Sequence, residues 1–163
     1  RERTVVINGF SKAYAMTGLR LGYAMGPEVA IDAMTKVHQY AMLSAPTTAQ
    51  HAALSAIDRC DDEVERMRRE YDRRRRYVVS RLRELGIEVA EPGGAFYAFP
   101  RVAEVAPDGD ARAFATELLE AEGVAAVPGT AFGAGGEGHI RISYATGLDD
   151  LKEAMTRLER FLS

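Results

Sequence analysis

Hydrophobic and polar residues follow two kinds of spacing along this chain, and the spacing changes at glycine, proline and polar breaks. Short runs of β-branched and apolar residues are typical of buried strands. Longer segments repeat apolar residues every three or four positions, which is typical of helices with one buried face. The predicted strands are residues 4–7, 19–25, 87–91, 95–99, 124–127 and 139–144. The predicted helices are residues 28–42, 49–58, 61–85, 110–122 and 149–162.

The longest predicted helix, residues 61–85, carries both an acidic and a basic run. Its acidic residues 61–63 suit the positive end of the helix dipole. Residues 73–76 are all arginine and invite a nucleic-acid interpretation, but successive helical residues point in different directions. Acidic neighbours such as Glu70 and Asp72 lie within ion-pairing reach, so we favour a solvated, ion-paired face. The residues expected on the buried side are Val64, Met67, Tyr71, Val78, Leu82 and Leu85.

Composition narrows the class of protein. The chain has 163 residues, 47% hydrophobic and 28% charged, which fits one domain or two small lobes with a sizeable core. The net charge of -3 gives no general basic field for nucleic acid, so an anion site must be local. The single cysteine, Cys60, excludes an internal disulfide. Without a run of about 18 apolar residues or a signal-peptide layout, we expect a soluble, cytoplasmic protein with no membrane partner.

Residues 8–26 contain the first candidate site, with Lys12 between two strand-like segments and Arg20 eight residues later. Lysine has a pKa of about 10.4, and burial beside an apolar strand would disfavour the ammonium and leave a nucleophilic amine. Arginine matches two phosphate oxygens at once, and Gly18 and Gly22 allow close backbone approach. The pair suits a ligand with an electrophilic carbon and a phosphate. The alternative is that both side chains are solvated at strand ends.

The pattern S-K at Ser11, followed by G-x-R-x-G-Y at Gly18, resembles the signature around the Schiff-base lysine of class I/II aminotransferases. These aspartate/aromatic aminotransferase-like enzymes depend on pyridoxal phosphate (PLP) and have fold type I. The resemblance implies an α/β fold in which residues 1–60 end the large PLP-binding domain. Residues 61–163 would then form the C-terminal small domain with its long connecting helix.

In the resembling family the cofactor lysine lies well past the middle of the chain, so these residues look like the C-terminal part of something longer. The preceding part would carry the aspartate that faces the pyridine nitrogen, the ring stacked on the cofactor and the amide loop around the phosphate. Alone, this fragment is expected to bind cofactor weakly. We also expect residues 1 to about 45 to be displaced, domain-swapped or paired with another copy.

Arg141 is the second candidate site residue. It stands between Ile140 and Ile142 in apolar surroundings, where an unpaired guanidinium is costly, so something must pair with it. The string P-G-x-x-F-G from Pro128, followed by H-I-R-I-S from His139, is similar to the family segment whose arginine grips the substrate α-carboxylate. The resemblance implies a two-pronged contact that sets the Cα–H bond perpendicular to the cofactor ring. The alternative is a surface arginine on an edge strand.

The resemblance implies transfer of an amino group between an amino acid and a 2-oxo acid in a homodimer, with no metal. Lys12 would be the catalytic residue and would also bind the cofactor, whose phosphate Arg20 would hold. Gly9 stands where some relatives place a phosphate-binding hydroxyl, and Ser11 is the candidate replacement. Tyr40 stands near where some dicarboxylate-specific members have an arginine, so no preference for aspartate is predicted.

Two other functions remain open from the sequence. A PLP-dependent carbon-sulfur β-lyase would keep the fold and cofactor but eliminate a group at the β-carbon. A ligand-sensing domain of this fold would be fused to a DNA-binding segment of a transcription regulator. Products from cysteine-type substrates would identify the first, and a winged-helix sequence upstream would identify the second.

Several other residues have structural interpretations. His38 and His51 have no partner at ligand spacing and are predicted to lie on helix faces. Residues 134–138 are glycine-rich but lead into a strand rather than a helix, so a mobile connection is favoured over a phosphate cradle. Phe96 and Tyr97 belong to a sequence that resembles the family's small-domain hairpin, and both are predicted to be core residues on opposite sides.

Overall fold

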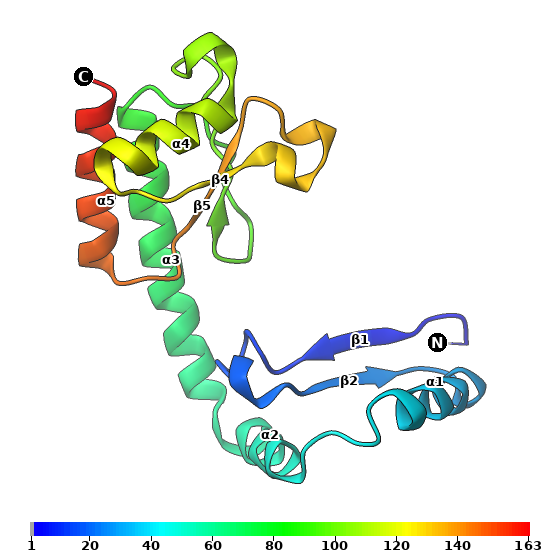
Figure 1. The fold of residues 1–163 in the computed structure, drawn as a ribbon. Helices are drawn as coiled ribbons and strands as arrows, with labels where there is room; N and C mark the ends of the chain where they lie inside the picture. The colour runs from blue at the N-terminus through cyan, green and yellow to red at the C-terminus, as the bar shows by residue number, and fades with distance from the viewer. Residues whose placement is uncertain (1) are drawn as a thin grey trace. The chain divides into compact units, whose positions relative to one another are not determined.

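A computed structural model describes residues 2–163, and its ribbon is drawn in Figure 1. The chain divides into two compact units, Arg1–Met67 and Arg68–Ser163. Helix α3 (Asp61–Glu84) begins in the first unit and ends in the second. The proposed domains of the whole protein, residues 1–60 and 61–163, stay a prediction.

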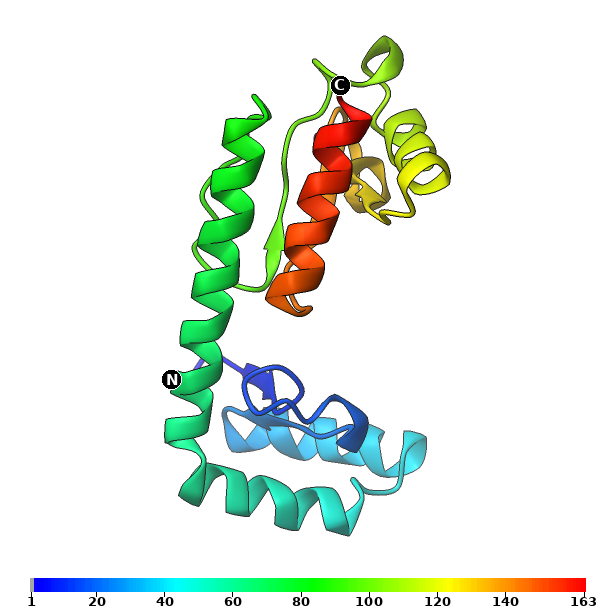
Figure 2. The same cartoon turned by 90° about the vertical axis from the view of Figure 1, so that its left-hand side faces the viewer.

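The first unit contains one pair of strands followed by two helices (Figures 1 and 2). Strands β1 (Val6–Gly9) and β2 (Gly22–Met25) are antiparallel, and no third strand from the described residues joins them. Helix α1 (Glu28–Ala41) starts directly after Pro27, whose fixed φ suits a helix start. Helix α2 (Thr47–Arg59) buries only small side chains, namely Ala49, Ala53 and Ala56.

Both strands of the first unit begin later than the sequence predicts. Part of the predicted strand 19–25 is instead a 3-10 turn, Thr17–Leu19, followed by Arg20 in the left-handed conformation. Strand β1 extends to Gly9 because this residue pairs with Gly22. A Cβ on Gly22 would lie 3.0 Å from the carbonyl oxygen of Asn8, so this close pairing requires glycine.

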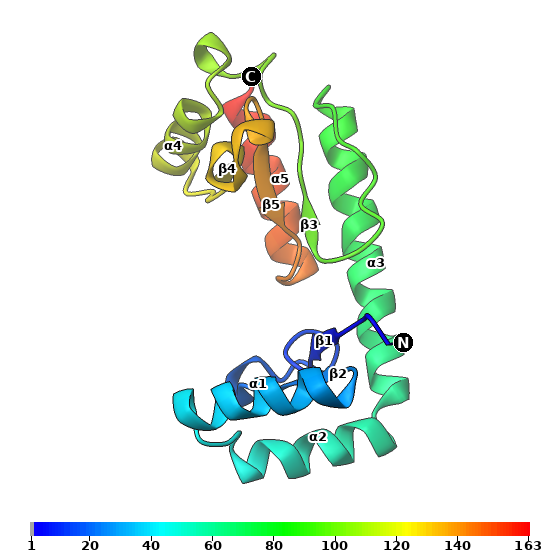
Figure 3. The same ribbon diagram turned by 90° about the vertical axis from the view of Figure 1, so that its right-hand side faces the viewer.

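The second unit is built on a three-stranded antiparallel sheet in the order β3-β5-β4. Its strands are β3 (Tyr97–Ala98), β5 (Ile140–Ser143) and β4 (Val127–Pro128). Helices α4 (Ala111–Glu122) and α5 (Leu148–Phe161) and the C-terminal half of α3 pack with this sheet (Figure 3). The large side chains buried in this core are Val78, Leu82, Phe114, Leu118, Ile140, Tyr144, Met155 and Leu158.

Helix ends in the second unit agree with the sequence. Asp110 precedes α4, and its carboxylate accepts from the backbone N–H of Arg112. Gly123, with φ 66°, ends the helix in the left-handed conformation that glycine tolerates. The predicted ranges for α3 and α5 differ from the observed ones by a single residue at any end.

Strands in this unit are shorter than predicted. Residues 87–91 form only an isolated bridge, in which Glu88 pairs with Arg101 rather than with residues 95–99. The predicted alternation of buried and exposed residues in this segment is still correct, because Ile87 and Val89 are buried. Residue Ala95 has φ 58°, and this turn delays the returning strand until β3.

Candidate functional site

The β1–β2 loop, residues 10–21, carries Lys12, Ser11 and Arg20. The loop is held at its base by Phe10, which is buried and whose ring lies 5.5 Å from each of the rings of Tyr14 and Tyr23. The backbone N–H of Phe10 donates to the carbonyl of Leu21, and its own carbonyl accepts from the N–H groups of Tyr14 and Met16. One aromatic anchor therefore fixes the backbone immediately before the predicted cofactor lysine.

Lys12 and Ser11 follow this anchor on the turn. In this chain by itself Lys12 is exposed and Ser11 is half-buried, and the burial of Lys12 in the cofactor site stays a prediction. The Lys12 carbonyl accepts from Ala15, which has φ 54° and turns the chain sharply. The strand pair provides the turn that presents the amine but does not cover it.

Arg20 occupies a conformation that is uncommon for a residue with a side chain. Its φ of 52° and ψ of 51° lie in the left-handed region, where a non-glycine residue is mildly strained. One guanidinium nitrogen donates to the carbonyl of Thr17 at 3.0 Å. This contact steadies the side chain on its own loop and uses one of its five N–H donors.

The donor set of this loop fits a phosphate-bearing carbonyl compound. It combines a primary amine on Lys12, a guanidinium fork on Arg20 and the hydroxyl of Ser11, all within ten residues of chain. A guanidinium binds two phosphate oxygens at once, and an amine is the nucleophile that carbonyl chemistry needs. The functional groups of these residues therefore match those of pyridoxal phosphate: the amine suits its aldehyde, and the guanidinium and hydroxyl suit its phosphate.

Arg141 belongs to the second unit and lies on β5, where it pairs with Val127 of β4. Its guanidinium carbon is 4.3 Å from the ring centre of Tyr97 and 4.5 Å from that of Phe132. The side chain is half-buried, and no carboxylate in residues 2–163 forms an ion pair with it. The neighbours of this guanidinium in the described residues are thus two aromatic rings. The three residues Tyr97, Arg141 and Phe132 are called here the arginine clamp.

Tyr97 and Phe132 are site residues that sequence reasoning missed. The core role predicted for Tyr97 is wrong, because its ring lies against Arg141, whereas Phe96 packs at the edge of the core. The signal was present in both cases, since Tyr97 ends the G-A-F-Y string and Phe132 lies inside P-G-x-x-F-G. Sequence spacing alone does not reveal that the two strings converge on one side chain.

The glycine-rich segment supports this clamp. Residues 134–138 are predicted to be a mobile connection, but Ala134–Gly136 forms a 3-10 turn that packs closely on Gly129. A Cβ on Gly136 would lie 2.0 Å from the carbonyl oxygen of Gly129, so the backbones touch only because both residues are glycine. This contact fixes the turn Gly129–Phe132 that carries Phe132.

The four successive arginines of α3 are an ion-paired face, as the sequence indicates. Glu70 accepts from Arg73 and Arg74, and Asp72 accepts from Arg75 and Arg76. The hydrogen bond from Arg73, supported by Arg74, holds the pKa of Glu70 below its usual value. These arginines therefore already have carboxylate partners within the helix.

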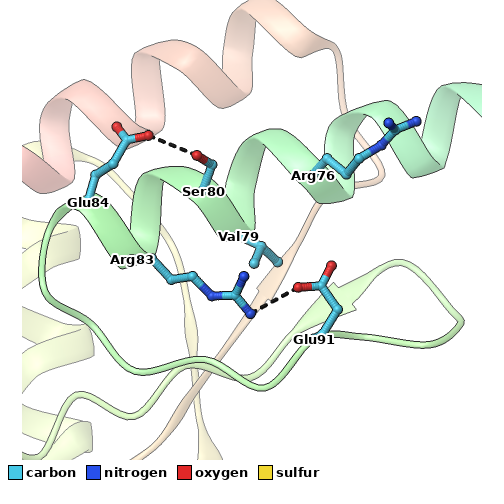
Figure 4. Close-up of a pocket in the computed structure, with 6 residues that line it drawn as sticks. All are labelled: Arg76, Val79, Ser80, Arg83, Glu84 and Glu91. Carbon is cyan, nitrogen blue, oxygen red and sulfur yellow. Dashed lines mark hydrogen bonds and ion pairs between the residues drawn. The ribbon is translucent and has the colours of Figure 1, made fainter.

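A hollow of about 420 Å³ lies beside this face of α3 (Figure 4). Its basic residues are committed to neighbours, since Arg83 pairs with Glu91 at 2.9 Å and Arg76 pairs with Asp72 at 2.6 Å. The figure also shows Ser80 donating to Glu84. The hollow is consequently a gap between ion pairs of the surface.

Among the described residues, no cluster of three or more His, Cys, Asp or Glu side chains is arranged to hold a metal ion. His38 and His51 lie on helices α1 and α2, as predicted, and both are exposed. A search of the same residues finds no helix long and apolar enough to cross a membrane.

The described residues thus form an α/β fold with Lys12 and Arg20 on one loop and, in the second unit, Arg141 beside two aromatic rings. The comparisons with known proteins identify the class of protein. Residues 1–158 match the family described as aminotransferase class I and II. The chain therefore belongs to the class I and II aminotransferases, and the predicted resemblance and fold class are confirmed.

Individual relatives agree with this assignment. The chain is 52% identical over 162 residues to the putative aminotransferase YugH of Bacillus subtilis, covering 99% of this chain and 42% of that protein. It is 46% identical over 163 residues to an aspartate aminotransferase of Pyrococcus abyssi, covering 99% of this chain and 41% of that protein. The chain thus spans about two fifths of the length of these curated relatives.

Solved structures give the same result. An aromatic aminotransferase from Pyrococcus horikoshii superposes with a TM-score of 0.94 at 47% identity, covering 99% of this chain and 43% of that structure. Likeness at this level establishes the fold type I architecture for the described residues.

Proposed function

We propose that this chain supplies the cofactor lysine and the substrate-carboxylate arginine of a PLP-dependent aminotransferase. The observation that carries the proposal is the β1–β2 loop, which offers Lys12 and Arg20 from one anchored turn with Arg20 in the left-handed conformation. The relatives that match the chain end to end are named aminotransferases, which supports the same reaction.

Three residues of the loop would hold the cofactor. Arg20 would bind two phosphate oxygens, and Ser11 would add a hydroxyl donor in place of the missing hydroxyl at Gly9. Lys12 would hold the cofactor through its amine. When bound, pyridoxal phosphate supplies the electron sink for the electrons released at the substrate Cα.

Lys12 would also move the proton in the chemical step. A general base must be neutral before it accepts a proton, and its efficiency is greatest when its pKa is near the working pH. The Nζ atom would take the proton from the substrate Cα and return one on the way to product. Covering the exposed Lys12 with the remainder of the protein would disfavour its ammonium form.

Arg141 would orient the substrate. A carboxylate held by both prongs of a guanidinium loses its freedom to rotate, which fixes the direction of the Cα–H bond. The rings of Tyr97 and Phe132 would keep water from the parts of the guanidinium that they contact. The half-buried position of Arg141 strengthens this charge-assisted contact.

The substrates would be an amino acid and a 2-oxo acid. Relatives of similar identity are named for aspartate and for aromatic substrates, so the α-amino and α-carboxylate groups are the chemistry shared by all of them. A homodimer is proposed because apolar side chains of the first unit are exposed in the chain by itself. Location in the reducing cytoplasm fits the single cysteine.

The test is the visible absorbance of the full-length protein with pyridoxal phosphate, measured for the parent and for Lys12→Ala. The band of the lysine-bound cofactor should be lost in Lys12→Ala only. The matched controls are Lys36→Ala and Lys152→Ala, which replace the other lysines of this chain and should keep the band. A band that survives in Lys12→Ala contradicts the proposal.

A further inference from the structure

Two aromatic rings lie close to the guanidinium of Arg141. Tyr97 approaches to 4.3 Å and Phe132 to 4.5 Å, measured from the guanidinium carbon to the ring centre. Both distances lie within the range of about 6 Å in which a cation is attracted to the face of a ring. A ring carries no lone pair for a conventional hydrogen bond, so the N–H groups of the guanidinium are the part left for a ligand.

The two rings are themselves held by separate parts of the second unit. Phe132 contacts the ring of Phe99 at 6.1 Å in an edge arrangement, and Phe99 stacks on His139 at 5.2 Å and 8°. On the other side, Tyr97 contacts Phe96 at 4.6 Å. The arginine clamp is thus the centre of a continuous row of rings.

The backbone of the turn that carries Phe132 is held by two contacts. The backbone N–H of Gly129 donates to the carbonyl of His139 at 2.7 Å, and the close approach of Gly129 to Gly136 locks the same turn. Tyr97 is fixed by its strand, where it pairs with Ser143 of β5. The backbone of each ring-bearing residue is therefore positioned by contacts that do not involve the Arg141 side chain.

We propose that Tyr97 and Phe132 are positioning residues that fix the plane of the Arg141 guanidinium, so that only its N–H edge meets the substrate α-carboxylate. This inference rests on the proposed function of Arg141. A long, otherwise unpaired side chain samples many rotamers, and stacking selects one of them before the substrate arrives. A carboxylate then binds without the additional loss of freedom that a mobile arginine would require.

Phe132 offers a competing role because 51% of its surface is exposed. An exposed ring beside a carboxylate-binding arginine is also suited to direct contact with an apolar substrate side chain. The two roles differ in one respect: a positioning residue acts only through Arg141, whereas a substrate contact acts without it.

The experiment compares KM and kcat of the full-length protein for Phe132→Leu and Tyr97→Leu. Leucine keeps an apolar side chain but removes the ring face, so KM for the amino acid should rise about 3- to 30-fold, more than kcat falls. Phe132→Tyr and Tyr97→Phe keep the ring and should recover most of the lost affinity. The matched control is Phe161→Leu, which removes a ring from the edge of the core and should lower the unfolding midpoint without raising KM.

The decisive arm is a double-mutant cycle with Arg141→Lys. Lysine has no flat fork to be aligned, so Phe132→Leu should have almost no further effect on KM in that background. A Phe132→Leu effect that persists in full means that the ring contacts substrate directly and overturns the inference. Leucine variants with unchanged KM and a lowered unfolding midpoint also overturn it, since the rings then serve the fold alone.

Failure of the underlying function gives a different pattern. If Arg141→Lys leaves KM for both substrates unchanged, Arg141 does not bind the carboxylate, and the proposed function and the inference fall together. If Arg141→Lys raises KM but neither leucine variant does, the function of Arg141 stands and only the clamp is contradicted.

Discussion

The two units of this chain differ in how far their apolar side chains are buried. In the second unit, large side chains from three helices and the sheet meet in a closed core, and Leu82, Phe114 and Leu158 are fully buried. In the first unit, Val29 is 83% exposed and Tyr40 is 88% exposed, although both lie in a helix with apolar spacing. The second unit contains the partners of its core side chains, whereas the first leaves many large apolar side chains exposed.

This difference separates the two halves of the proposed site. Arg141 lies on a strand of the self-contained unit, so its clamp is formed by the described residues alone. Lys12 lies on a strand pair that leaves the side chain exposed. The carboxylate half should therefore be formed in this chain, whereas the cofactor half should depend on the remainder of the protein.

The largest expected effect is a contrast in hydrogen exchange when these 163 residues are expressed alone. Amides of α4 and α5 should exchange at least about tenfold more slowly than those of residues 1 to about 45, because local opening is easiest where few apolar contacts are buried. Hydrogen-exchange mass spectrometry measures this, and light scattering reports whether copies associate. A monomer whose two units are equally protected from hydrogen exchange would contradict the difference between the units.

A second prediction compares one substitution in the two units. Leu82→Ala removes a fully buried side chain and should lower the free energy of unfolding by about 2–5 kcal/mol. Leu54→Ala, on α2, removes a side chain that is 60% exposed and should change it by less than about 0.5 kcal/mol. Urea unfolding of the chain followed by circular dichroism provides both values. Equal losses at the two positions would contradict the contrast.

The third prediction concerns the glycine turn that supports the clamp. Gly136→Ala places a Cβ against the carbonyl oxygen of Gly129 and should destabilise the chain by about 1–3 kcal/mol. Gly135→Ala is the matched control, because nothing lies within 4 Å of its new methyl group. If Gly136→Ala is as stable as Gly135→Ala, the turn is not closely packed.

The smallest expected effect is the acid dependence of the ion pairs on α3. Hydrogen bonds from Arg73 and Arg74 lower the pKa of Glu70, so its contribution to stability is present above the unfolded pKa of about 4.3 and lost as pH falls through the lowered value. The unfolding midpoint of Glu70→Gln should therefore lie slightly below that of the parent at pH 7. The difference should shrink below about pH 4 and in high salt.

Glu120→Gln, on the exposed face of α4, is the control for the acid prediction and should change the midpoint little at either pH. A Glu70→Gln difference that stays the same at low pH would show that Glu70 does not act through its charge.

Sequence reasoning succeeds where local signals decide the structure. The ends of α4 follow from Asp110 and Gly123, and the acidic start of α3 marks its first turn. The motif around Lys12 identifies the family because it combines residue types at fixed spacing. These features depend on residues that are close together along the chain.

It fails where the structure depends on distant residues. The spacing of apolar residues in α1 predicts a helix with a buried face, but no residue of this helix is buried among the described residues. The clamp joins Tyr97 and Phe132, which are 35 positions apart, through Arg141 on a third segment. The contact of Gly129 with Gly136 likewise has no local signature beyond an abundance of glycine.

The most direct test of the central claim is to reduce the full-length protein with borohydride in the presence of pyridoxal phosphate and to map its peptides by mass spectrometry. Reduction converts the link between cofactor and lysine into a stable bond. We predict that the cofactor mass appears on the peptide that contains Lys12. Its appearance on Lys36, Lys152 or a lysine outside this chain would contradict the account.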